Sequence, residues 1–202
     1  MQTQARFFSV LGLIGIAVLL WSAMKPHDYF TWVLEVFPIF VAMPVLIFTY
    51  QKLPLSNLLY LLILVHAIIL MVGGHYTYAE VPFFNWLRDT YHLDRNYYDR
   101  VGHFVQGFVP AMIAREILLR QGVLASGRWL FFIVCSICLS ISACYEFVEW
   151  WVAVASGTGA DAFLGSQGDV WDTQWDMFTA LIGSIMAQLL LAKYHDKKML
   201  NL

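Results

Sequence analysis

Six apolar segments, each about twenty residues long, constrain the fold of this chain more than any other feature. A helix of about 20 mostly apolar residues can cross the hydrocarbon core of a bilayer, where every backbone polar group must be bonded within the protein. The sequence therefore predicts an all-α fold, a polytopic membrane bundle of six transmembrane helices, with residues 1–202 forming a single integral membrane domain. The segments cover residues 7–23, 30–50, 53–73, 101–119, 129–156 and 174–192.

The composition supports this interpretation. Hydrophobic residues make up 60% of the chain and charged residues 13%, a balance typical of integral membrane proteins. The formal net charge of -2 offers no basic surface for a nucleic acid. The lipid bilayer is therefore the partner that the composition predicts.

The distribution of lysine and arginine predicts the orientation, because short cytoplasmic loops carry an excess of these residues. If the N-terminus is cytoplasmic, eight of them lie on the cytoplasmic side and four on the other side. We therefore expect both termini in the cytoplasm, with the loops 74–100 and 157–173 outside. The cytoplasmic eight are Arg6, Lys52, Arg115, Arg120, Arg128, Lys193, Lys197 and Lys198, and the other four are Lys25, Arg88, Arg95 and Arg100.

The loop between the third and fourth segments, residues 74–100, is rich in aromatic residues. Pro82 is suited to the first turn of a short helix, which would place Phe83, Leu87 and Tyr91 on one side. Aromatic side chains concentrate at the membrane–water interface, so we expect an aromatic interfacial segment that lies in the membrane plane. A lid over a substrate site is the alternative.

A stretch without lysine or arginine, residues 161–176, leads into the last apolar segment and contains Asp161, Asp169, Asp172 and Asp176. If a helix starts near Asp169, then the last three share one face, since neighbours on a helix surface are three or four residues apart. Such a row of carboxylates repels itself unless a cation or protons neutralise it. Asp169 has a simpler alternative role as a helix N-cap.

Ionisable residues of the other segments gather at the same predicted depth, near the outer ends of the helices. Such groups are costly inside a membrane and usually have a function. We therefore expect a shared internal pocket that opens to the outer face of the membrane. The residues concerned are Glu35, His75, Asp99, His103, Glu146 and Glu149.

Histidines combined with several carboxylates form a ligand set suited to a divalent metal ion such as Zn, Mn, Mg or Ca. A structural ion pair of the two glutamates with Arg95 or Arg100 is the alternative, and His195 is interpreted as a flanking residue without a functional role. The expected metal ligands are His75, Asp99, His103, Asp169, Asp172 and Asp176, and the expected catalytic carboxylates are Glu146 and Glu149.

Four motifs resemble the YjdF family of bacterial inner-membrane proteins. They are GGHYTY (73–78), DRVGHFVQGFVPA (99–111), YEFVEWW (145–151) and FLGSQGDVWDTQWDM (163–177). The resemblance covers nearly the whole chain and implies a fold and a bacterial inner-membrane location rather than a reaction. A second, weaker resemblance is to VanZ-like membrane proteins, although Ala180 departs from the asparagine of their last motif.

Three classes of function stay open at this point. A metal-dependent membrane enzyme, a hydrolase or transferase acting on a lipid or lipid-linked substrate, would use a metal-activated water and a glutamate as base. An ion- or proton-coupled transporter or metal-binding protein would use the same carboxylates to carry cations or protons. It is disfavoured because the inner halves of the helices offer few polar groups. A structural or partner-binding membrane protein would need the polar groups only for assembly.

Overall fold

The computed structural model describes residues 2–157 and 161–200, and all regular structure within them is helical. This confirms the all-α prediction. The long helices are α1 (Gln2–Ser22), α2 (Tyr29–Thr49), α3 (Asn57–Tyr76), α5 (Tyr98–Arg120), α6 (Arg128–Ser156) and α8 (Asp172–Met199). The short elements are the 3₁₀ helix η1 (Tyr78–Glu80), α4 (Pro82–Tyr91) and α7 (Asp161–Leu164).

The helices begin where local chemistry favours a start. The backbone N–H of Thr31 donates to a carboxylate oxygen of Asp28 at 2.6 Å, which caps α2 and lowers the pKa of Asp28. Pro82 is the first residue of α4, as predicted, because its fixed φ fits a helix start and it has no N–H to leave unbonded.

Five of the long helices, α1, α2, α3, α6 and α8, are long and apolar enough to cross a membrane. Helix α5 differs because it carries charged residues near both ends, namely Asp99, Arg100, Arg115, Glu116 and Arg120. Most of them are buried inside the bundle. The length and composition of the helices thus support five of the six expected spans.

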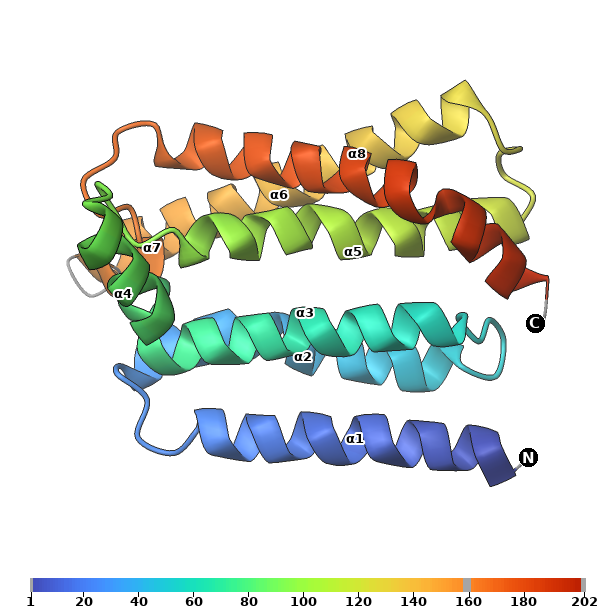
Figure 1. Cartoon of the computed structure of the whole chain (residues 1–202), viewed down its shortest axis with the longest axis horizontal. Coiled ribbons are helices and arrows are strands. Elements are labelled where there is room, and N and C mark those ends of the chain that lie inside the picture. The colour runs from blue at the N-terminus through green and yellow to red at the C-terminus, as the bar shows by residue number, and fades with distance from the viewer. Residues whose placement is uncertain (1, 158–160, 201–202) are drawn as a thin grey trace.

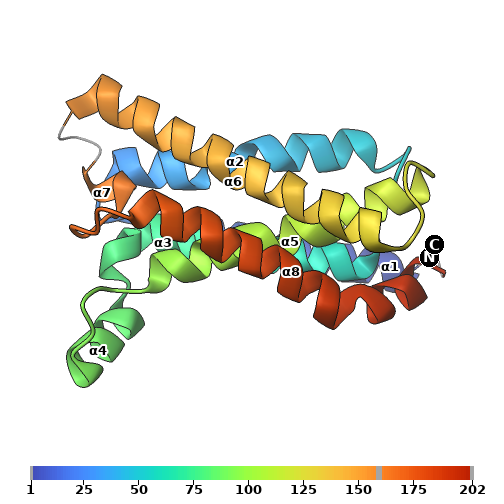
Figure 2. The same cartoon turned by 90° about the horizontal axis from the view of Figure 1, so that it is seen from above.

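The long helices run alternately up and down, so α1 begins and α8 ends at the same end of the bundle (Figure 1). Helix α5 lies at the centre, packed against α3, α6 and α8, while α1 and α2 pack on α3. Helices α4 and α7 both lie at the opposite end, on different sides of the bundle, and α4 projects away from it (Figure 2). We call this end the α4 end and the other the terminal end.

Helices α5 and α8 form the closest pair because glycines let their backbones touch. A Cβ atom added to Gly107 would overlap the carbonyl oxygen of Ala180, and one added to Gly183 would overlap the carbonyl oxygen of Phe104. Small residues allow this approach of helices in a membrane, where dispersion contacts replace the hydrophobic effect between helices. Helices α5 and α8 are therefore closely packed below Asp176.

An apolar cluster of buried side chains fills the bundle between the α4 end and the terminal end. It joins α3, α5, α6 and α8. Its fully buried members are Leu59, Ala111, Met112, Val134, Cys138 and Ala187. This cluster separates two groups of buried polar residues, one at each end.

Candidate metal centre at the α4 end

His103, on the first turns of α5, lies at the centre of the candidate site and is 6% exposed. Its Nε2 atom is 3.5 Å from an Asp99 carboxylate oxygen, one helical turn earlier, and 3.7 Å from an Asp176 oxygen on α8. The three ligand atoms lie within 4.8 Å of one another. The structure thus brings together three of the metal ligands expected from the sequence.

The other ring nitrogen of His103 has a partner outside the carboxylate pair. Nδ1 lies 3.0 Å from the side-chain oxygen of Gln106, which accepts when Nδ1 carries a proton. Nε2 then presents either a second proton or a lone pair to the two carboxylates. The distances from Nε2 exceed those of good hydrogen bonds. They are close to the roughly 3.4 Å that separates neighbouring ligands of a tetrahedral ion with bonds of about 2.1 Å.

Helix α6 contributes a second group to the same site. An Oε1 atom of Glu146 is 3.9 Å from His103 Nδ1, and Glu149 supplies another oxygen within 4.8 Å of the group. The Glu146 oxygen is buried and has no hydrogen-bond partner among the described residues, and the same holds for the hydroxyls of Ser142 and Tyr145. Unpartnered buried acceptors are costly, so this face of α6 is suited to a bound cation or a polar ligand.

Two arginines neutralise much of the aspartate row. Arg100 pairs with Asp176 and lies 2.6 Å from Asp172 and 3.2 Å from Asp169. Arg95 also pairs with Asp172 and lies 3.4 Å from Asp169. The cations that the row requires are therefore supplied in part by guanidinium groups.

These pairs overturn the alternative in which the arginines bind the glutamates. Among the described residues, Arg95 and Arg100 pair with aspartates of α5, of α8 and of the turn before α8. Glu146 and Glu149 face His103 instead. The carboxylates of Glu146 and Glu149 are thus not paired with these arginines and lie beside His103.

The start of α8 differs from the expectation. The helix begins at Asp172 and not near Asp169, whose carboxylate accepts the backbone N–H of Trp171 in the preceding turn at 2.9 Å. Asp169 is therefore not the N-cap of α8. Asp172 and Asp176 share a helix face as predicted, and Asp169 reaches the same arginines from the turn.

A pair of amide contacts holds this turn against the start of α5. The side chain of Gln167 accepts from the backbone N–H of Asn96 and donates to its carbonyl oxygen, both at 2.9 Å. Arg95 also donates to the carbonyl oxygen of Gly165 at 3.2 Å. These bonds link two loops that are about seventy residues apart in sequence, and they explain how the acidic stretch reaches His103.

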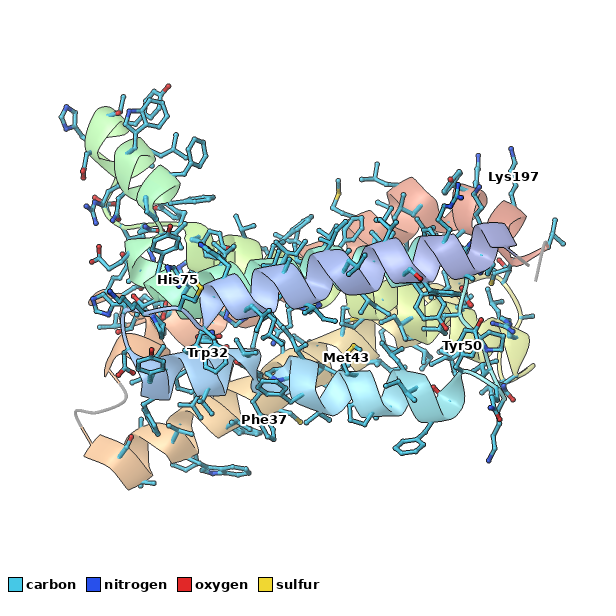
Figure 3. All side chains as sticks on the ribbon, turned by 90° about the horizontal axis from the view of Figure 1, so that it is seen from below. Trp32, Phe37, Met43, Tyr50, His75 and Lys197 are labelled. Carbon is cyan, nitrogen blue, oxygen red and sulfur yellow. The ribbon has the colours of Figure 1, made fainter. Side chains whose placement is uncertain are left out.

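His75 lies away from the candidate centre, and its prediction as a metal ligand finds no support in this geometry. Its Nδ1 atom is 3.0 Å from the carbonyl oxygen of Ser22, and its ring packs on Trp21 and Tyr76. Figure 3 shows His75 beside the end of α1, with Lys197 at the far end of the bundle. Helix α3 ends at the next residue, Tyr76, and His75 lies against the end of α1.

Two further residues of the site were not among the expected metal ligands or catalytic carboxylates. Glu35 of α2 is 5% exposed, and its carboxyl interacts electrostatically with Asp99 and His103. The ring of Tyr78 is buried in a slot that only glycines leave open, because a Cβ on Gly73 or Gly102 would collide with it. Burial raises the pKa of Tyr78 well above its ordinary value, so its hydroxyl stays protonated beside Glu35. The glycines at positions 73 and 102 are the sequence feature that could have indicated this buried ring.

The second buried polar group lies at the terminal end and corrects the interpretation of His195. This residue is fully buried, with Nε2 2.8 Å from Glu116 and Nδ1 3.0 Å from Arg115. Glu116 also accepts from the backbone N–H of Ser56 at 2.8 Å and from Arg120 at 3.0 Å. The inner halves of the helices are thus less apolar than expected, although the apolar cluster lies between the two polar groups.

A cavity of about 310 Å³ opens beside the arginines at the α4 end. It is lined by Arg95, Tyr97, Arg100, Asp169, Trp175 and Thr179. The Nε atom of Arg95 is buried and has no hydrogen-bond partner in the described part of the chain. The cavity therefore offers polar groups beside the carboxylates.

Comparison with known proteins gives the family. The family described as "Predicted membrane protein (DUF2238)" matches residues 7–197. The "Inner membrane protein YjdF" of Escherichia coli (strain K12) is 48% identical over 182 residues, covering 90% of this chain and 87% of that protein. No solved structure matches the chain. The relative and the candidate spans support a location in the bacterial inner membrane. The resemblance to YjdF is therefore confirmed, and the chain belongs to the DUF2238 family of membrane proteins.

Proposed function

We propose that this protein is a metal-dependent hydrolase or transferase whose substrate is a lipid or a lipid-linked molecule. The observation that carries the proposal is the placing of His103 Nε2 between oxygens of Asp99 and Asp176 at 3.5 and 3.7 Å, too long for strong hydrogen bonds and close to the spacing of metal ligands. His103, Asp99 and Asp176 would hold a divalent ion. Arg100, which binds Asp176 as well, would keep that carboxylate oriented.

The charge of the site supports a cation there. Seven carboxyl groups surround two guanidinium groups and one imidazole, so negative charge is in excess when the acids are ionised. A divalent ion would reduce that excess where water is scarce. The seven are Glu35, Asp99, Glu146, Glu149, Asp169, Asp172 and Asp176.

The chain's own groups provide acid–base chemistry beside this centre. A bound divalent ion would supply a water of lowered pKa and polarise an oxygen of the substrate. Glu149, which has an oxygen within 4.8 Å of a His103 ring nitrogen and of a Glu146 oxygen, would take a proton from the attacking water. Asp169 and Asp172, held by the arginines, serve to fix the turn before α8.

The proposed topology has six spans with both termini in the cytoplasm. The 23 residues of α5 extend about 34 Å, enough to cross the hydrocarbon core, and the charged residues at their ends are mostly turned into the bundle. The candidate centre would then face the outer side. Phe83, Trp86 and Tyr91 of α4 are exposed and suited to an interfacial helix lying beside it.

The transporter alternative is weakened by the apolar cluster between the two polar groups. On α5, the residues between Gln106 and Arg115 are apolar, and Ala111 and Met112 among them belong to that cluster. A cation crossing the membrane would need polar groups along this length. Chemistry at one face therefore fits the arrangement better than transport.

Metal binding can be tested on the purified protein in mild detergent. Metal content is measured by plasma mass spectrometry, and Tm is measured before and after chelation. We expect chelation to lower the Tm and metal to restore it, because the ion stabilises only the folded state. His103→Ala should abolish the chelator effect. His66→Ala, which removes an imidazole from α3 outside the site, should keep it.

Each variant is compared with itself, with and without chelator, so a variant with a lower starting Tm can still be interpreted. If His103→Ala does not fold, Asp99→Asn provides the same test. Wild-type protein that contains no metal and melts identically with and without chelator would refute the proposal. The site would then be a network of ion pairs with a structural role.

A further inference from the structure

The cavity beside the arginines at the α4 end is lined mostly by hydrogen-bond donors. Its volume of about 310 Å³ is at the low end of the range of small-molecule sites, which suits a small polar group rather than a whole lipid. Among the described residues that line it, only ionised Asp169 is without a side-chain donor. The five with donors are Arg95, Tyr97, Arg100, Trp175 and Thr179. Such a lining favours a ligand that offers several acceptor oxygens.

The charges at the cavity wall favour an anion. Two guanidinium groups and one carboxylate line it, so positive charge is in excess at the wall itself. The other aspartates that pair with these arginines do not line the cavity and are buried, namely Asp99, Asp172 and Asp176. A divalent ion held at His103 would offset their repulsion of a bound anion.

Arg95 carries a donor that no group of the chain satisfies. Its side chain is 6% exposed, and its two terminal nitrogens donate to aspartates and to the carbonyl oxygen of Gly165. The remaining donor, Nε–H, is buried and has no acceptor among residues 2–157 and 161–200. Buried donors without an acceptor are rare and costly. An oxygen of a group bound in the cavity would supply the missing acceptor.

The cavity adjoins the candidate metal centre through Arg100. This guanidinium group lines the cavity and also pairs with Asp176, a proposed ligand of the ion. His103 follows Arg100 by three residues on α5, so the two are neighbours on the helix surface. A group bound in the cavity would therefore lie beside the proposed metal centre.

The rim of the cavity borders surface that faces lipid. Tyr97 and Trp175 at the rim are 39% and 50% exposed, and such aromatic side chains concentrate at the level of lipid head groups. Beyond Thr179, the apolar side chains of Ile182 and Met186 are exposed at helical spacing on α8. A head group could thus enter the cavity while its apolar chain lies against α8.

We propose that this cavity binds the phosphate group of a membrane phospholipid. The inference rests on the proposed function and narrows its substrate to a lipid that carries a phosphate. A phosphodiester has several acceptor oxygens and one negative charge, and guanidinium groups are suited to both. An ammonium head group would instead require acceptors, which this wall provides mainly at Asp169. Free inorganic phosphate shares the chemistry but has no apolar chain to contact the exposed face of α8.

The test measures binding to the full protein in mild detergent by isothermal titration calorimetry. The probes are dioctanoyl phosphatidylglycerol, dioctanoylglycerol, which has the same chains without the phosphate head, and inorganic phosphate. Arg95→Lys keeps the positive charge beside the aspartates and removes the Nε–H donor. Arg88→Lys is the matched control, because Arg88 pairs with Asp89 and does not line the cavity. Thr179→Leu, outside the ion pairs, replaces a donor of the wall with a larger apolar side chain.

We expect phosphatidylglycerol to bind and dioctanoylglycerol to bind at least tenfold more weakly. Arg95→Lys should weaken phosphatidylglycerol binding about tenfold, the effect of one lost hydrogen bond to a charged group. Thr179→Leu should weaken it several-fold, and Arg88→Lys should bind like wild type. If Arg95→Lys does not fold, Thr179→Leu decides the test.

Three results would overturn the proposal. The first is equal binding of phosphatidylglycerol and dioctanoylglycerol, which would show that the phosphate is not recognised. The second is wild-type affinity in both Arg95→Lys and Thr179→Leu. The third is inorganic phosphate that binds as tightly as the phospholipid, which would assign the cavity to a free anion.

Two further results separate this proposal from the metal proposal. Phosphatidylglycerol binding that depends on Arg95, together with a wild-type Tm insensitive to chelation, would leave a phosphate site without metal chemistry. A chelator-sensitive Tm without phosphatidylglycerol binding would leave a metal centre whose substrate is not a phospholipid.

Discussion

Gly183 of α8 provides the sharpest test of the packing on which the site depends. Replacing it with alanine adds one methyl group at the point where α8 touches α5. That methyl would overlap the Phe104 carbonyl oxygen and lie 3.1 Å from the Phe108 nitrogen. Both obstacles are backbone atoms of a helix, so relief requires α5 and α8 to move apart. We therefore expect Gly183→Ala to destabilise the protein, and Gly107→Ala to do the same.

The magnitude follows from two opposing effects. Overpacking of a close-packed contact costs about 1–3 kcal/mol, and a backbone obstacle places this site near the upper value. Alanine in place of glycine favours a helix by up to about 1 kcal/mol. The net loss is about 2 kcal/mol, which corresponds to a fall in Tm of about 4–8 °C for a domain of this size.

The assay is thermal unfolding in detergent followed by circular dichroism, with Gly12→Ala as the control. Gly12 lies inside α1 and has nothing within 4 Å of an added Cβ, so this variant keeps only the helix-favouring effect and should melt at or above wild type. If Gly183→Ala and Gly107→Ala also melt at or above wild type, the close contact of α5 and α8 is wrong. The geometry around Asp176 and His103 would then be wrong as well.

Three further predictions concern other parts of the chain. Glu116→Ala should destabilise by about 3–5 kcal/mol, because it leaves His195 and other buried donors without an acceptor; in the same melting assay the exposed Asp89→Ala should change little. Asp28→Ala should lower the Tm at pH 7 because it removes the cap of α2. The pKa of Asp28 is lowered on folding, so its contribution to the stability of the protein is complete above its unfolded pKa of about 3.9. That contribution is lost as the pH falls through the folded pKa. The difference from wild type should therefore close in acid, and a difference that widens would contradict the capping role. Reporter enzymes fused to the C-terminus and inserted in α4 should report cytoplasmic and periplasmic locations respectively, and two signals from the same side would contradict six spans.

Much of the helical architecture could be predicted from the sequence, because apolar length decides membrane helices almost without reference to neighbours. The gathering of His103, Asp99, Glu146 and Asp176 followed from depth and helical spacing. Glu35 was expected in the shared pocket by its depth, but no role could be assigned to it, because that role depends on which helix α2 packs against. That choice is made by contacts among chemically similar apolar surfaces.

The partners of the charged residues were harder to predict. Arg95 and Arg100 bind aspartates rather than glutamates because the Asn96–Gln167 contact brings the turn before α8 onto the start of α5. His75 was counted with the site by depth alone, yet α3 presents it to α1. Depth along a helix is readable from the sequence, whereas the direction around the helix axis toward a particular neighbour is not.

The sequence by itself determined that this is a helical membrane protein and that one group of its ionisable residues lies near one end, since hydrophobic length and charge position act residue by residue. Only the tertiary structure decided which of those groups meet. Gly107 and Gly183 bring α5 and α8 into contact, and Gly73 and Gly102 admit the ring of Tyr78. It also separated His195 and Glu116 at the terminal end from His103 at the α4 end. The physical reason is that ion pairs and metal ligands act over a few ångströms, and such distances are set by how the helices pack.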